Sequence, residues 1–98
     1  MIINKDQSIV DLISRLRIDE LGWCVLDHWE ADQCAIGIGN SLSGDRLVYV
    51  STYNLTKGRY NCECENRNPQ SSLGYDVVYE AEDIDFDELH GVIDQHLW

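Results

Sequence analysis

The stretch YVSTYNLTKGRYNCECE, residues 49–65, decides the fold, because its side chains alternate in character, reach a turn, and alternate again. A period of two is typical of a β-strand that buries one face. A tight turn at NLTKG is predicted to join the two arms into a hairpin. In the second arm, Cys62 and Cys64 are predicted to face the core. Glu63 and Glu65 alternate with them and are predicted to leave the sheet on the other side.

Further strands follow from the same pattern on both sides of this hairpin. The segment GWCVLDHWEADQCAIGIGN predicts an earlier hairpin that places Val25 opposite Ile38. In this register Asp27 lies on an otherwise apolar face. Either the predicted register is wrong or Asp27 has a special role. The segment YDVVYEA predicts a fifth strand with Val77 and Tyr79 turned toward the core.

Helical spacing marks both ends of the sequence. Near the start, four apolar residues recur at the intervals of an amphipathic helix: Ile9, Leu12, Ile13 and Leu16. Ser8 is the expected N-cap of this helix. Near the end, DFDELHGVIDQHLW predicts a second amphipathic helix, with Asp85 as its N-cap and Glu88 at the third helical position.

The element order is therefore α-β-β-β-β-β-α, within a single domain that covers residues 1–98. Short connections favour an antiparallel meander, in which each strand pairs with the next along the chain. We predict an α+β fold. It is a two-layer domain whose antiparallel five-stranded meander sheet carries the N- and C-terminal helices on one face.

The chain is strongly acidic, with 18 Asp and Glu against 7 Lys and Arg and a net charge of −11. The last Lys or Arg is Arg67, and the 31 residues after it contain eight acids. Such a surface repels nucleic acid and anionic membranes, so neither is an expected partner, whereas basic proteins are attracted. Asp6 and Asp11 stand where a signal peptide is apolar, which predicts a cytoplasmic protein.

Four cysteines raise the question of a metal or redox site. A structural zinc ion needs about four ligands that converge, and Cys62 and Cys64 supply only two on one side of a strand. Cys24 and Cys34 are ten residues apart and lack ligand spacing. Because free cysteine is common in protein cores, we expect Cys62 and Cys64 to fill the core, with no metal and no cofactor.

No constellation of catalytic residues emerges from the sequence. The segment IGIGNSLSGD contains paired glycines, but Leu42 stands where a dinucleotide-binding motif has its third glycine. Cys24 and His28 are four residues apart on a strand, and therefore about 13 Å from each other, which is too far for a hydrogen bond. We therefore predict that the protein is not an enzyme.

The strongest remaining feature is a predicted acidic surface. If the fifth strand pairs beside the CECE arm, four carboxylates share the sheet face away from the helices, close to an acid-rich turn. The predicted partner-binding residues are Glu63, Glu65, Asp76, Glu80, Glu82 and Asp83. An ordinary solvated sheet face is the alternative interpretation, and the pattern does not decide between the two.

The strand–turn–strand segment RLVYVSTYNLTKGRYNCECE and the closing helix DFDELHGVIDQHLW resemble the small acidic immunity proteins of bacterial polymorphic and contact-dependent toxin systems. The resemblance covers about the second half of the chain and is one of pattern and size. It implies a protein without catalytic residues that neutralises a toxin or another effector, with an acidic surface facing a basic active site.

Three other hypotheses stay open. A phage-encoded inhibitor that mimics nucleic acid accounts for the same charge. A small metal-binding or enzymatic domain that uses Cys62 and Cys64 is the second. The third is a homodimer, in which an exposed strand at the edge of the sheet pairs with the same strand of a second copy.

Overall fold

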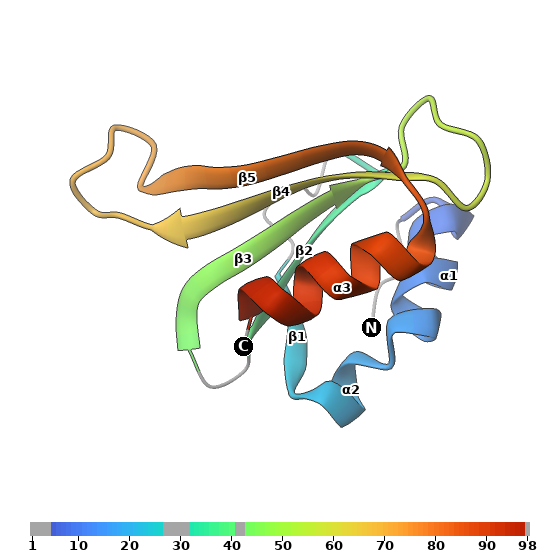
Figure 1. The fold of residues 1–98 in the computed structure, drawn as a ribbon, viewed down its shortest axis with the longest axis horizontal. Coiled ribbons are helices and arrows are strands. Elements are labelled where there is room, and N and C mark those ends of the chain that lie inside the picture. Colours follow the sequence, from blue (N-terminus) through green and yellow to red (C-terminus); the bar gives the residue numbers. More distant parts are fainter. Residues whose placement is uncertain (1–4, 27–31, 41–42, 98) are drawn as a thin grey trace.

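The structure, a computed structural model, describes residues 5–26, 32–40 and 43–97. The helices and strands follow one another in the predicted order, with one short helix added after the first (Figure 1). In chain order they are α1 (Gln7–Leu16), α2 (Ile18–Leu21), β1 (Trp23–Leu26), β2 (Ala35–Asn40), β3 (Ser43–Ser51), β4 (Tyr60–Arg67), β5 (Tyr75–Ile84) and α3 (Phe86–Leu97).

The strands form one antiparallel sheet in the order β1-β2-β3-β4-β5, so each strand pairs with the next along the chain. α1 and α3 lie against the same face of this sheet, which gives a molecule of two layers (Figure 1). The predicted α+β fold with a five-stranded meander is therefore confirmed. The side of the sheet that carries Ile38, Val48 and Cys64 is the helix face, and the side that carries Tyr49 and Glu63 is the open face.

The register of the sheet places apolar residues in rows across the helix face. Val25 pairs with Ile38, as the sequence predicts. The row continues through Val48 and Cys64, because directly paired residues of antiparallel strands lie on the same face. Asp27, which raised the question of register, lies outside the described residues.

One hydrophobic core fills the space between the sheet and the two long helices. Burial of this apolar surface is the main favourable contribution to folding. β5 contributes only partly buried side chains to it, those of Ala81 and Ile84. The buried members of the core are Ile9, Leu12, Leu16, Trp23, Ile36, Ile38, Val48, Val50, Tyr60, Cys62, Cys64, Leu89, Ile93 and Leu97.

Hydrogen bonds at the N-termini of α1 and α3 determine where these helices begin. Asp6 caps α1, because its carboxylate accepts a bond of 3.0 Å from the backbone N–H of Ser8. The prediction that Ser8 is the cap was wrong, since Asp and Ser both cap helices well and the pattern does not separate positions two residues apart. Asp85 caps α3 as predicted, by accepting a bond of 2.9 Å from the backbone N–H of Glu88.

The connection between β3 and β4 is longer than the tight turn predicted from NLTKG. It contains two successive turns, closed by bonds from Leu55 N–H to the Thr52 carbonyl at 3.2 Å and from Arg59 N–H to the Thr56 carbonyl at 3.0 Å. Gly58 adopts a φ of 83° in the second turn, a conformation that glycine takes without strain. The pairing of β3 with β4 is unaffected by this difference.

Candidate functional site

The hairpin formed by β4 and β5 presents a largely exposed part of the sheet. Its far end extends past α3, so no helix covers it (Figure 1). Three consecutive apolar side chains of β5 are exposed: Val77 by 44%, Val78 by 55% and Tyr79 by 51%. Single exposed apolar residues are ordinary on protein surfaces, and here three of them follow one another along the last strand of the sheet.

A β-bulge at Val78 changes which way the β5 side chains face. Cys64 pairs with Tyr79, whereas the next residue of β4, Glu65, pairs with Val77, so Val78 is the extra residue. Val77 therefore lies on the open face, and Tyr79 lies on the helix face. The prediction that both residues point toward the core was wrong, because one extra residue inverts the alternation on one side of it.

The same bulge separates acids that were predicted to form one patch. Glu80 pairs with Glu63, so these two residues share the open face as predicted. Asp76 pairs with Asn66, the residue after Glu65, and therefore lies on the helix face. The prediction of a single-face patch is thus wrong for Asp76, which is exposed on the other side of the hairpin.

Glu65 is buried, although it was predicted to be exposed. Only 2% of its surface is accessible, and its partners on the neighbouring strands are the apolar residues Leu47 and Val77. Its Oε1 atom is buried and has no hydrogen-bond partner among the described residues. Burial, followed by the charge of Glu63 and a hydrogen bond with it, raises the pKa of Glu65 to about 7. The carboxyl group therefore holds a proton in a large share of the molecules at neutral pH.

Glu63 lies beside the buried carboxyl group of Glu65 and is paired with an exposed acid of β5. It is partly buried and lies between Tyr49 of β3 and Glu80 of β5. The pKa of Tyr49 is raised, first by burial and then by nearby carboxylates that include Asp32 and Glu63. Glu63 and Glu80 are directly opposite each other, and like charges in this arrangement destabilise a sheet.

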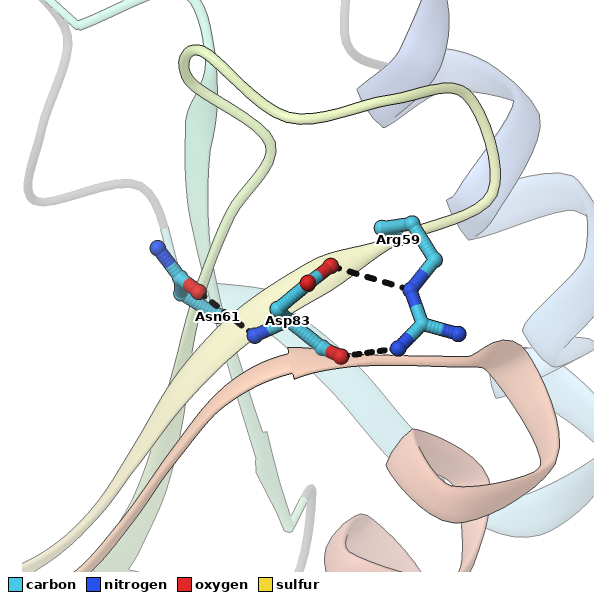
Figure 2. Close-up of polar contacts among 3 residues, drawn as sticks. All are labelled: Arg59, Asn61 and Asp83. Atoms are coloured by element: carbon cyan, nitrogen blue, oxygen red, sulfur yellow. Dashed lines mark hydrogen bonds and ion pairs between the residues drawn. The ribbon is translucent and has the colours of Figure 1, made fainter.

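Asp83 belongs to an internal network. Its φ of 54° is left-handed, at a second irregularity in the pairing of β4 with β5. Arg59 donates to its carboxylate at 3.0 Å and to its backbone carbonyl, and Asn61 Oδ1 accepts from its backbone N–H at 2.9 Å (Figure 2). Of the two acids in the predicted acid-rich turn, Asp83 is thus occupied within the protein. Glu82, beside it, is exposed.

Cys62 and Cys64 lie in the hydrophobic core, as predicted, and each is 2% exposed. Burial raises the pKa of both thiols, that of Cys64 to about 12. The thiolate, which is the form that binds metals and attacks electrophiles, is therefore disfavoured at both positions. Over residues 5–26, 32–40 and 43–97, no three His, Cys, Asp or Glu side chains are placed to hold a metal ion.

Replacing Cys62 or Cys64 by alanine is expected to lower the free energy of unfolding by about 1 kcal/mol, because contacts in the core are lost. Urea denaturation of each variant measures this change. Cys24→Ala is the control at a half-buried position and is expected to have a smaller effect. Unchanged stability of the two core variants, together with about one zinc ion per wild-type chain in elemental analysis, would contradict the packing role.

Sequence reasoning missed a polar recess beside the hairpin. It is lined by Asp45, Arg46, Asn66, Arg67 and Pro69. Two of these residues meet because β3 pairs with β4 in a register that sets Arg46 opposite Asn66. Their separation in the sequence gives no signal of this contact. The recess combines bases with an acid, so it does not extend the acidic surface of the hairpin.

These features define a small two-layer α+β domain with an acidic hairpin at one edge of its sheet. No protein-family model matches the sequence, and no match is found among curated proteins or solved structures. In the part of the chain that the structure describes, no helix has the length and apolar character needed to cross a membrane.

Proposed function

We propose that this chain is a non-catalytic binding protein that docks a basic protein partner through the β4–β5 hairpin. The observation that carries the proposal is β5, a strand at the end of the sheet whose acidic and apolar side chains are both exposed. As the specific case we propose a cytoplasmic immunity protein that neutralises a toxin. This case is supported by the resemblance of the second half of the sequence to such proteins.

The charge of the hairpin supports a basic partner. The net charge is −11, and in the described residues Glu80 and Glu82 have no ion pair, whereas Asp83 is paired with Arg59. Unpaired exposed carboxylates attract a basic protein over roughly 8 Å at physiological salt. They raise the association rate and make it depend on the salt concentration.

The exposed apolar residues of β5 supply the short-range part of recognition. Burial of apolar surface stabilises a complex by roughly 25 cal/mol per Å², before the cost of association is subtracted. Tyrosine is a frequent anchor residue at interfaces, which favours Tyr79 as the centre of contact. An apolar centre surrounded by charged residues is the usual composition of a protein-binding surface.

The test begins with capture of partners by the tagged protein from a lysate of the organism that encodes it, followed by mass spectrometry. We expect a basic protein, whose association rate falls as salt is added. The hairpin variant combines Asp76→Asn, Glu80→Gln and Glu82→Gln, and the matched control combines Asp11→Asn, Glu20→Gln and Asp94→Asn. The hairpin variant is expected to associate about tenfold more slowly and with a weaker dependence on salt.

Both variants remove the same charge from exposed positions, so each is expected to keep the stability of the wild type within about 0.5 kcal/mol. The control is expected to retain most of the wild-type association rate. An equal loss in the two variants would assign the effect to net charge alone. Unchanged affinity and unchanged salt dependence of the hairpin variant would place the binding surface elsewhere.

A further inference from the structure

We propose that the outer edge of β5 binds an extended, basic segment of the partner, which joins the sheet as a sixth strand. This inference rests on the proposed function and deepens it, because it states the conformation and the chemistry of the segment that is bound.

The outer edge of β5 has unused hydrogen-bonding capacity. Among the described strands, β5 is the last of the sheet, and its one partner is β4. In an antiparallel edge strand, alternate residues direct their backbone N–H and C=O groups away from the sheet. Among the described residues, no backbone hydrogen bond from outside β4 reaches the stretch between Asp76 and Glu82. An added strand satisfies these groups with main-chain hydrogen bonds.

The side chains along this edge fit a segment in which basic and apolar residues alternate. Because of the bulge, each face of β5 offers one exposed acid and one exposed apolar or aromatic residue. These residues are Glu80 and Val77 on the open face, and Asp76 and Tyr79 on the helix face. A lysine or arginine of an added strand therefore meets a carboxylate on whichever face it lies. Cross-strand pairs of opposite charge stabilise a sheet.

A second copy of this chain fits the same edge poorly. Two β5 strands would bring the acids of both copies together, and each chain has a net charge of −11. β-Bulges and charged side chains also protect edge strands from pairing with themselves. The same acids attract a basic strand, so the edge discriminates between these two occupants by charge.

Amide hydrogen exchange, followed by NMR with synthetic peptides, tests the inference. The first peptide has the length of β5, 10 residues, alternates lysine with valine, and has capped ends. A control peptide has glutamate in place of lysine. We expect the lysine peptide to bind and to slow exchange at the amides of β5 that point away from β4. The glutamate peptide is expected to bind at least about tenfold more weakly.

Two matched charge reversals separate the edge from the net charge. Glu80→Lys on β5 and Asp94→Lys on α3 change the charge of the chain by the same amount. Glu80→Lys is expected to weaken binding of the lysine peptide by about tenfold, and Asp94→Lys by much less. A lysine peptide that is N-methylated at every residue is expected to lose binding, because neither of its edges can donate to β5.

Each proposal has its own contradicting result. Binding of the lysine peptide without slower exchange in β5 overturns strand addition and leaves acidic docking intact. Exchange in β5 that slows with rising protein concentration, in the absence of peptide, identifies a second copy as the occupant and overturns the inference. Failure of the lysine peptide to bind overturns the inference, whereas the proposed function is contradicted only by unchanged partner binding of the hairpin variant.

Discussion

Replacing Glu65 by glutamine is expected to stabilise the protein above pH 7, by an amount on the order of 1–3 kcal/mol. The Glu65 side chain is 2% exposed, and its pKa is raised from 4.5 to about 7. Because the pKa is raised, the folded state disfavours the ionised form of Glu65. Each pKa unit of the shift corresponds to a free energy of about 1.4 kcal/mol. Glutamine has nearly the same shape and carries no charge at any pH.

The expected effect of Glu65→Gln depends on pH in a defined direction. The unfolded chain releases the Glu65 proton near pH 4.5, and the folded protein releases it near pH 7. Between these values the folded state holds a proton that the unfolded state has lost, so stability from this group falls as the pH rises. The difference in the free energy of unfolding between variant and wild type therefore grows from about pH 4.5 to about pH 7 and then levels off.

Urea denaturation of both proteins at several pH values between about 4 and 8 measures this difference. Asp94→Asn, at an exposed position of α3, is the matched control for the loss of one carboxylate. If Glu65→Gln were destabilising at pH 8, the Glu65 carboxylate of the wild type would have to be stabilised by a partner in the folded protein. That result would contradict the buried, unpaired state of Oε1.

The second large effect is expected for Leu89→Ala, which should lower the free energy of unfolding by about 2–5 kcal/mol. Leu89 lies on the buried side of α3 with 0% exposure, and alanine leaves a cavity between this helix and the sheet. A loss of this size is a large share of the stability of a small domain. Urea denaturation, followed by the fluorescence of the buried Trp23, measures it.

Gly91→Ala is the matched control for Leu89→Ala, because it lies in the same helix. Gly91 is exposed, and a Cβ atom added there meets no atom within 4 Å. The higher helix propensity of alanine is expected to raise the free energy of unfolding by about 0.5–1 kcal/mol. Effects of the same sign at both positions would contradict the observed orientation of α3 on the sheet.

Much of the sheet could be predicted because the physical signal for it is local and regular. Alternation with a period of two identified the core-facing side of the second hairpin arm, including Cys62 and Cys64. The same signal gave the pairing of Val25 with Ile38. The cap of α3 at Asp85 was predictable for a similar reason, since the capping residue lies directly before the apolar stripe in the sequence.

The β-bulge at Val78 could not be predicted from alternation. Nothing in YDVVYEA distinguishes a regular strand from one with an extra residue, because the backbone pairing with β4 decides where the extra residue lies. The prediction therefore held for Glu80, on one side of the bulge, and failed for Val77 and Asp76 on the other.

The burial of Glu65 shows a second limit, because Glu63 and Glu65 have nearly the same neighbours in the sequence. They differ in their neighbours across the sheet, which are Tyr49 and Glu80 for Glu63, and Leu47 and Val77 for Glu65. These contacts depend on the register of three strands and on the bulge. A single strand pattern contains no information about them.

The order of the strands also bears on how the chain reaches this structure. Because every strand pairs with the next along the chain, each step of sheet formation closes a loop between neighbouring segments. The closure that spans the chain is the one that brings α1 and α3 into the same core. Loop-closure entropy therefore opposes the docking of the two helices more strongly than the pairing of any two strands. Sheets in which each strand pairs with the next along the chain are rich in local contacts. They fold faster than sheets built from distant segments.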